Sequence, residues 1–496
     1  QRMFEFLEQY QGLIQQILTQ PDIVVKSLTL ITESAAKILP AYDEQLAVQW
    51  SGHVLDRICQ FAEQTPDKTA IEDNGGKISY RQLHQHITFL TQQFNSQGVT
   101  HGTTVAVIGN RSIKWTCTVL SVLNAGGVFC ILDPNYPPQR LAQYINEITS
   151  PYLAVVQSND DAIKNIVTQL RAIGSLEDIT LLDCMTEPEN NTSPVPTVEV
   201  PPRPDDLAYI NFTSGTTGIP KAIGGSMRPI SHFLSWYEHE FEVDSTDRFS
   251  MLSGLSHDPI LRDLFAPFWL GATLCIPAPQ DMLNPERLYE WMQTSHISVT
   301  HLTPAMGMLL SMSPNAENQV EQRPLIDLRY LFFGGDLLMS DHLRAIRKKA
   351  PNAKIVNFYG ATETPQAMGF FRVPEHSSGE NRHGSASPIP IGCGIAAVQL
   401  LVVNDAGNPC GIGELGEIWI RTPYLSKGYL NDGESTKHKF ISNPFTTWQD
   451  DIIYKTGDLG RHGPDCNIEF VGRSDRQLKI NGFRIEPGTI EHCLRE

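Results

Sequence analysis

The chain has 496 residues, too many for one ordinary hydrophobic core, so about two to four sub-domains are expected. Its formal net charge of -17, with no Lys/Arg-rich block, argues against nucleic-acid binding, and no apolar run reaches the roughly 18 residues of a membrane span. The nine cysteines form no C-x-x-C pair, and several lie in apolar runs, which indicates reduced core residues of a cytoplasmic protein.

The first 31 residues form a distinct segment. Apolar residues at helical spacing predict an amphipathic helix over residues 3–19, followed by a strand-like tail over residues 24–31. Because two such elements cannot bury their own apolar faces, we expect the end of an upstream domain or an arm packed on the main body.

The next part of the chain alternates short apolar strands with helices. Strands are predicted at residues 69–71, 105–108 and 128–132, with a helix over residues 115–124. This alternation is typical of α/β layers with a mostly parallel sheet, and a second stretch of the same kind covers residues 249–373.

Two segments with loop-like composition follow, and after them the sequence predicts antiparallel strands. Residues 185–206, rich in Pro, Asn, Thr and acids, predict a linker, and the Ser/Gly-rich residues 376–388 predict a mobile loop. Antiparallel strands are expected at residues 398–403, 416–421 and 468–472. The chain ends within a predicted helix that starts near Pro487, which indicates a fragment.

Residues 212–221 read FTSGTTGIPK and follow a predicted strand at residues 207–212. Free backbone N–H groups, hydroxyls and a terminal lysine suit a phosphate cradle, although a flexible surface turn would have the same composition. The loop is not a Walker loop, because Ile219 and Pro220 stand between its second glycine and its lysine.

Six further motifs follow the order found in adenylate-forming enzymes, the superfamily of acyl-CoA synthetases, luciferases and peptide-synthetase adenylation domains. The segments that resemble this superfamily are residues 78–83 (ISYRQL), 123–127 (LNAGG), 357–364 (NFYGATET), 413–430, 454–459 (YKTGDL) and 472–480 (GRSDRQLKI). The resemblance covers about residues 45–496.

The resemblance implies an α/β fold with a large core of two α/β sheets layered with helices, a small β-barrel and the start of a mobile C-terminal sub-domain. It implies a condensation-domain-like arm and linker at residues 1–44, an adenylation core at residues 45–474, and a truncated small sub-domain at residues 475–496 with its hinge at Asp475.

The implied chemistry is the attack of a carboxylate on the α-phosphate of ATP with loss of pyrophosphate, for which positioning and charge neutralisation suffice. By resemblance, the β- and γ-phosphates would be wrapped by Thr213, Ser214, Gly215, Thr216, Thr217 and Gly218, beside Lys221. Glu363 would hold Mg²⁺ and Thr362 would touch the α-phosphate. Tyr359 would stack on adenine. Asp458 would accept from the ribose hydroxyls, and Arg473 would add to the ribose and phosphate contacts.

Two departures from the family pattern stand out. Ala222 occupies the position of the glycine that usually follows the loop lysine, a change that should be tolerated. The catalytic lysine of the small sub-domain is absent, so we expect the chain to bind ATP and substrate but to adenylate slowly.

Within the superfamily, the N-terminal arm resembles the end of a condensation domain and its linker. The favoured interpretation is therefore an adenylation domain of a peptide synthetase, with an upstream condensation-like domain and a downstream carrier domain whose phosphopantetheine accepts the acyl group.

Residues 256–263 (SHDPILRD) and their flanks also resemble the fungal α-aminoadipate reductase. By position, the pocket would be lined by Asp258, Pro259, Arg262, His301, Phe332, Gly334, Phe358, Gln366 and Ala367. Asp258 would hold the substrate's α-ammonium group, and the two phenylalanines with Gly334 would leave room for an aromatic or long aliphatic group.

Arg262 lies four residues after Asp258, on the same helical face. It could pair with a second substrate carboxylate, pair with Asp258, or face away. Pairing with Asp258 would weaken the ammonium site and allow a keto or aryl acid, so acidic and large hydrophobic substrates both stay open. Two alternatives also stay open for the function: the adenylation part of an aminoadipate-type carboxylate reductase and a non-catalytic carrier-docking module.

Overall fold

The computed structural model describes residues 2–157, 160–184, 203–213, 220–312, 323–375, 387–475, 478–480 and 483–485. No helix within these ranges is both long and apolar enough to cross a membrane.

The largest sheet has nine strands, and its centre is parallel. Antiparallel strands close both edges. The spatial order is β15 (Cys393–Gly394), β14 (Thr364–Arg372), β13 (Lys354–Ala361), β12 (Tyr330–Phe333), β11 (Val299–Leu302), β9 (Arg248–Ser250), β10 (Thr273–Cys275), β1 (Thr69–Asp73) and β2 (Gly76–Ser79).

A second sheet of six strands is parallel except for its last strand, which pairs antiparallel. Its order is β6 (Thr180–Asp183), β5 (Tyr152–Val155), β3 (Thr104–Ile108), β4 (Val128–Leu132), β7 (Leu207–Thr213) and β8 (Lys221–Ser226).

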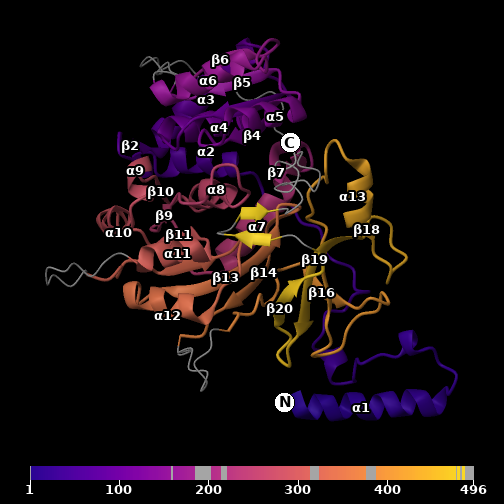
Figure 1. Ribbon diagram of the computed structural model, residues 1–496. Helices are drawn as coiled ribbons and strands as arrows, with labels where there is room; N and C mark the ends of the chain where they lie inside the picture. The colour runs from indigo at the N-terminus through magenta and orange to yellow at the C-terminus, as the bar shows by residue number, and fades with distance from the viewer. Residues whose placement is uncertain are drawn as a thin grey trace.

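Helices cover both faces of these two sheets (Figure 1). The main core includes α2 (Val54–Gln64), α3 (Tyr80–Ser96), α4 (Ile113–Asn124), α7 (Met227–Glu240) and α8 (Ile260–Leu270). A second core packs α5 (Pro138–Ile148) and α6 (Asp161–Ala172) on the six-stranded sheet. A third core packs α9 (Pro279–Met282), α10 (Pro285–Thr294), α11 (Pro304–Ser311) and α12 (Ser340–Lys349) around the nine-stranded sheet.

The sequence of β3 shows why the parallel strands of the six-stranded sheet are continuous apolar runs. Val105 and Val107 belong to the main core, while Ala106 and Ile108 belong to the core under α5 and α6. A strand covered on both faces has no polar side, because successive side chains point to opposite faces.

A third, wholly antiparallel sheet lies where the small barrel was expected. Its order is β16 (Gln399–Val403), β17 (Gly416–Arg421), β19 (Ile452–His462) and β18 (Phe440–Ser442), with β20 (Ile468–Arg473) paired to β19 and α13 (Gly433–Lys439) before β18. A two-stranded ribbon, β21 (Leu478–Ile480) and β22 (Phe483–Ile485), follows. The expected antiparallel strands and α/β layering are thus confirmed.

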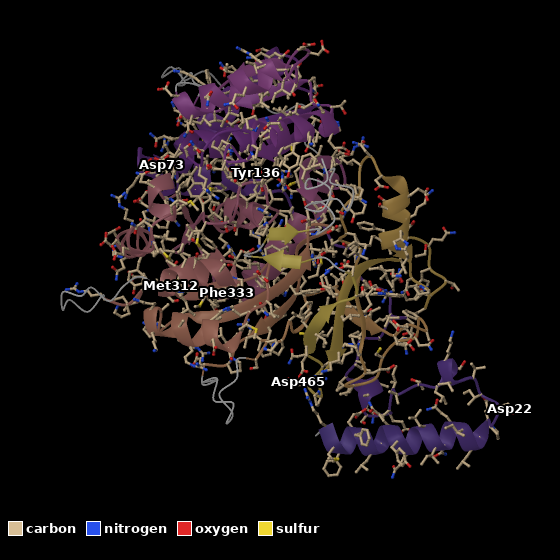
Figure 2. The ribbon with its side chains drawn as sticks, viewed as in Figure 1. Asp22, Asp73, Tyr136, Met312, Phe333 and Asp465 are labelled. Carbon is tan, nitrogen blue, oxygen red and sulfur yellow. The ribbon has the colours of Figure 1, made fainter. Side chains whose placement is uncertain are left out.

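The N-terminal arm begins with α1 (Arg2–Thr19), as predicted, but α1 buries none of its residues. It touches the antiparallel sheet region through few groups, among them the Gln9 side-chain amide, which donates to the Ile412 carbonyl at 2.8 Å. Asp22, beyond α1, lies away from the main body (Figure 2). The predicted strand at residues 24–31 is wrong: the segment contains a single 3₁₀ turn, Val25–Ser27, because its backbone pairs with no sheet edge.

Several expectations fall outside the described residues. Most of the proposed linker (residues 185–202), most of the Ser/Gly-rich segment (residues 376–386) and the predicted helix near Pro487 are among these. The proposed division of the chain at residues 44 and 474 stays a prediction.

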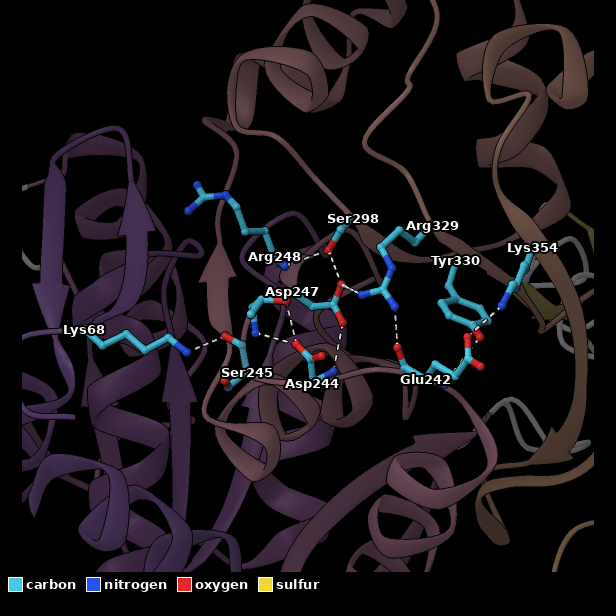
Figure 3. Close-up of polar contacts among 11 residues, drawn as sticks. Lys68, Glu242, Asp244, Ser245, Asp247, Arg248, Ser298, Arg329, Tyr330 and Lys354 are labelled. Carbon is cyan, nitrogen blue, oxygen red and sulfur yellow. Dashed lines mark hydrogen bonds and ion pairs between the residues drawn. The ribbon is translucent and has the colours of Figure 1, made fainter. Parts of the chain in front are cut away.

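A polar network centred on Asp247 joins the amino ends of three parallel strands (Figure 3). The buried Asp247 carboxylate accepts from the Ser298 hydroxyl at 2.6 Å, from the Arg329 guanidinium at 2.8 Å and from the Asp244 backbone N–H at 2.9 Å. Asp247, Ser298 and Arg329 directly precede β9, β11 and β12. The network therefore fixes one end of the sheet and leaves the carboxyl ends of the strands for a site.

Replacing Asp247 by alanine should lower the free energy of unfolding by about 3 kcal/mol, because it leaves Ser298 and Arg329 without their buried anion. Urea denaturation followed by circular dichroism measures this. As a control, Glu242→Gln removes an exposed carboxylate paired with Lys354 and should change the midpoint little. Equal decreases in the free energy of unfolding for the two variants would contradict the structural role of Asp247.

Candidate active site

A cavity of about 960 Å³ opens where the three sheets meet. Its walls come from loops that follow parallel strands: the segment after β9, the start of α8, and the ends of β11, β12 and β13. The six-stranded sheet adds the loops after β3 and β4 and the last two residues of β7, and the antiparallel sheet adds residues of β19 and β20. Ligands of open α/β sheets bind at the carboxyl ends of the strands, so this cavity is the natural site.

Nine of the residues predicted from sequence line this cavity: Thr213, Asp258, Pro259, Arg262, His301, Gly334, Thr362, Asp458 and Arg473. Six others are buried behind its wall: Phe332, Phe358, Tyr359, Glu363, Gln366 and Ala367. Lys221 begins β8 beside the cavity. Ser214, Gly215, Thr216, Thr217 and Gly218 lie outside the described residues.

The predicted ribose contact, Asp458, sits directly opposite Arg473 in the pairing of β19 with β20. The Asp458 carboxylate accepts from the Arg473 guanidinium and, at 2.7 Å, from the hydroxyl of Tyr359. Arg473 also forms two hydrogen bonds of 2.7 Å with Asp475, the predicted hinge residue. The proposed nucleotide contacts and the proposed hinge therefore share one chain of charged hydrogen bonds.

Tyr359 is buried and directs its hydroxyl to Asp458. Burial, reinforced by the Asp458 charge, raises the pKa of Tyr359 well above its ordinary value, so the phenol stays a donor. Its predicted stacking on adenine stays a prediction.

The two residues predicted to neutralise phosphate charge are both anchored by the segment before α13. Glu363 is fully buried, and its carboxylate accepts from the Tyr429 hydroxyl at 2.7 Å. The ammonium group of Lys221 lies 2.9 Å from an Asp432 carboxylate oxygen.

Asp258 sits just before α8, and its carboxylate accepts from the Thr362 hydroxyl at 3.3 Å. Burial raises its pKa to about 6, and the nearby Arg262 opposes this rise. The group predicted to hold a substrate ammonium is thus an anion at neutral pH and becomes neutral in mild acid.

Arg262 is 6% exposed and lines the cavity. Within the described ranges no hydrogen bond or ion pair of its guanidinium is found, and its buried Nε has no partner. The guanidinium carbon lies 5.5 Å from the centre of the Phe358 ring, and a terminal nitrogen lies 3.8 Å from where a Cβ on Gly334 would stand. Arg262 therefore neither pairs directly with Asp258 nor faces away from the cavity.

Both ring nitrogens of His301 have partners. Its Nδ1 donates to the Asp263 carboxylate at 2.9 Å, and its Nε2 lies 3.3 Å from the Tyr237 hydroxyl. Burial lowers the pKa of His301, which keeps the ring neutral with one donor and one acceptor. His301 is thus a fixed wall of the cavity.

Asp263 was not among the site residues predicted from the sequence. Its other carboxylate oxygen accepts from the backbone N–H groups of Leu252 at 3.0 Å and Ser253 at 2.8 Å, which shapes the loop after β9. The available signal was the Arg262-Asp263 pair inside an otherwise apolar helix, since charged residues are rarely fully buried without partners.

An aromatic group at the opposite wall was also missed. The rings of Tyr144 and Phe212 stack at 4.0 Å, and the Arg140 guanidinium lies over Tyr136 at 4.6 Å. Tyr136, Arg140 and Tyr144 recur at helical spacing, which is the signal that the sequence carried.

Two of the predicted pocket residues, Phe332 and Phe358, form an aromatic stack behind the cavity wall. Phe332 and Phe358 stack on each other with ring centres 5.0 Å apart, and both are buried. Gly334 and Arg262 line the cavity next to these rings, and the expected room for an aromatic or long aliphatic group stays a prediction.

Comparison with known proteins agrees with this architecture. The family described as AMP-binding enzyme matches residues 59–430. The L-2-aminoadipate reductase large subunit of Eremothecium gossypii is 34% identical over 99% of this chain, which spans 38% of that protein. A mycosubtilin synthase protein of Bacillus subtilis is 29% identical over 100% of this chain and 18% of its own length.

Solved structures include the nonribosomal peptide synthetase FmoA3 in its α-methyl-L-serine-AMP-bound form. It has a TM-score of 0.80 and 25% identity, and the match covers 96% of this chain and 51% of that one. The chain therefore belongs to the AMP-binding enzyme family, as an ATP-dependent adenylating ligase with the fold of peptide-synthetase adenylation domains.

Proposed function

We propose that the chain activates an amino acid with a second, side-chain carboxylate, of the size of 2-aminoadipate, as its acyl-adenylate. The acyl group then passes to the phosphopantetheine thiol of a carrier domain in the same synthetase. The observation that carries the substrate proposal is Arg262, a buried cation that faces the cavity without a hydrogen-bonding partner among the described residues. A buried charge is costly unless it is paired, so a substrate carboxylate in the cavity would be a favourable partner for Arg262.

The arrangement of charges distinguishes the two ends of such a substrate. Asp258 lies just before α8 and Arg262 lies in its first turn, and both line the cavity, so an α-ammonium group and a distal carboxylate can each meet an opposite charge. The stacked rings behind Arg262 leave the guanidinium as the polar feature of that wall. The names of the reductase relatives, which contain 2-aminoadipate, agree with this substrate class.

The residues also suit nucleotide chemistry that needs little covalent participation by the protein. Asp458 and Arg473 would hold the ribose, and Thr362, Lys221 and the loop around Thr216 would orient the phosphates. Glu363 supplies the carboxylate that Mg²⁺ binding to nucleotides requires, since this ion keeps phosphates and waters as its other ligands. When bound, Mg²⁺ neutralises phosphate charge.

A second candidate concerns the fate of the adenylate. The names of the reductase relatives favour an aminoadipate-type carboxylate reductase, whereas the peptide-synthetase structures favour a peptide synthetase. The condensation-like domain upstream is proposed from the sequence of the N-terminal arm. The adenylation step is common to both, so it can be tested alone. Membership of an enzyme family weighs against the non-catalytic docking module.

The direct test is ATP–pyrophosphate exchange on the full-length protein with the twenty amino acids, 2-aminoadipate, and aryl and keto acids. We expect exchange with an acidic amino acid and its loss in Lys221→Ala and Glu363→Ala. Exchange with an apolar or aryl acid alone would overturn the substrate proposal and keep adenylation.

Replacing Arg262 by methionine should stabilise the protein while abolishing exchange with the acidic substrate. The change exchanges a buried charge, which has a ring contact with Phe358 but no hydrogen-bonding partner among the described residues, for an apolar side chain of similar length, so the free energy of unfolding should rise by about 1 kcal/mol. Urea denaturation without ligand measures it. A clear loss of stability would show that Arg262 already has a structural partner.

The pKa of Asp258, about 6, predicts a pH dependence. The substrate ammonium needs the ionised carboxylate, so kcat/KM for the amino acid should be constant above about pH 7, be half-maximal near pH 6, and fall about tenfold per unit below about pH 5. Asp258→Asn should flatten this profile at a low value. An unchanged kcat/KM between about pH 5 and 7.5 in the wild type would contradict the role of Asp258.

A further inference from the structure

The segment 426–435, which runs from the loop after β17 into the first turn of α13, touches both residues expected to act on the phosphates and Mg²⁺. Its backbone runs along β8: the N–H of Lys427 donates to the Gly224 carbonyl at 2.7 Å, and that of Leu430 to the Ala222 carbonyl at 2.9 Å. An isolated bridge pairs Ile223 with Tyr429. The segment is therefore held in register with the strand that begins at Lys221.

Asp432 fixes the ammonium group of Lys221. The ammonium lies 2.9 Å from Asp432 Oδ2 and 2.6 Å from the Ser435 hydroxyl, which in turn donates to the same carboxylate at 2.5 Å. Asp432 also caps α13 by accepting from the Ser435 backbone N–H at 2.9 Å. Hydrogen bonding from Lys221, with that from Ser435, holds the pKa of Asp432 below its ordinary value.

Tyr429 connects the same ammonium group to Glu363. The Lys221 nitrogen lies 5.1 Å from the centre of the Tyr429 ring, within the range of a cation–π contact. The hydroxyl of that ring donates to the buried Glu363 carboxylate at 2.7 Å. A second hydrogen bond, from the Tyr429 backbone N–H to the Thr436 hydroxyl at 3.0 Å, fixes Tyr429 on α13.

We propose that Tyr429 and Asp432 are positioning residues for the adenylation reaction, Asp432 through Lys221 and Tyr429 through both Lys221 and Glu363. The inference rests on the proposed function. Lys221 has a long flexible side chain, and a preorganised charge stabilises a transition state only if it is already in place. Partners that orient metal-binding and charged groups typically affect activity or metal affinity about 10–100-fold.

The test uses the full-length protein and four variants. Tyr429→Phe keeps the ring and removes the hydroxyl that orients Glu363. Asp432→Asn keeps an N-cap acceptor on α13 and removes the charge, whereas Asp432→Ala removes both. Glu434→Gln is the matched control, because Glu434 is exposed and forms its ion pair with Lys437 on the same helix.

We expect Tyr429→Phe to raise the Mg²⁺ concentration needed for half-maximal exchange about tenfold. Asp432→Asn should lower kcat of exchange about tenfold or more, with the KM of the amino acid unchanged. Asn and Ala at position 432 should act alike if charge matters, while a much larger effect of Ala would assign Asp432 to helix capping alone. Rates and Mg²⁺ dependence within twofold of wild type would overturn the proposal.

Failure of the proposed function is distinguishable from failure of this inference. If the wild type exchanges pyrophosphate with no acid, the proposed function fails, and titration calorimetry with Mg·ATP then compares the same variants. Weaker Mg·ATP binding by Tyr429→Phe and Asp432→Asn than by Glu434→Gln would still support positioning. Binding equal to wild type would reject it.

Discussion

The site depends on a guanidinium that the fold buries without a hydrogen-bonding partner among the described residues. Arg262 stands in the first turn of α8, a helix whose every residue is buried, and it lines the cavity. Its neighbour Asp263 is already used by His301 and by two backbone N–H groups. Desolvation lowers the pKa of Arg262, and Asp258 opposes this at a distance beyond a direct ion pair. The proposed substrate carboxylate would supply the anion that pairs with Arg262.

The remaining architecture holds that cation in place. The Asp247 network fixes the amino ends of β9, β11 and β12. Residues at the carboxyl ends of the same strands form part of the cavity wall. The antiparallel sheet adds Asp458 and Arg473 from a different part of the chain. Arg473 forms hydrogen bonds with both Asp458 and Asp475. The proposed nucleotide contacts are therefore linked directly to the proposed hinge residue.

Much of this could be predicted from sequence where the signal is local. Apolar runs bounded by turns predicted β3, β4 and β7, and the motifs at residues 357–364, 454–459 and 472–480 each contribute residues to the cavity. The strand expected at residues 24–31 failed because strand formation needs a sheet edge, which a local pattern cannot supply. The contact of Lys221 with Asp432 spans 211 residues, and no spacing rule reaches that far. The orientation of Arg262 toward the cavity was one of three possibilities in the sequence, and only packing decides among them.

The central claim is that Arg262 binds a carboxylate group of the substrate. The most direct measurement compares kcat/KM of exchange for 2-aminoadipate and for its side-chain amide, which has the same size without the charge, in the wild type and in Arg262→Gln. The account predicts a preference for the acid of at least about 100-fold in the wild type, since a charged hydrogen-bonded pair discriminates strongly, and its collapse in the variant. Equal use of acid and amide by the wild type, or a preference that survives the substitution, would contradict it.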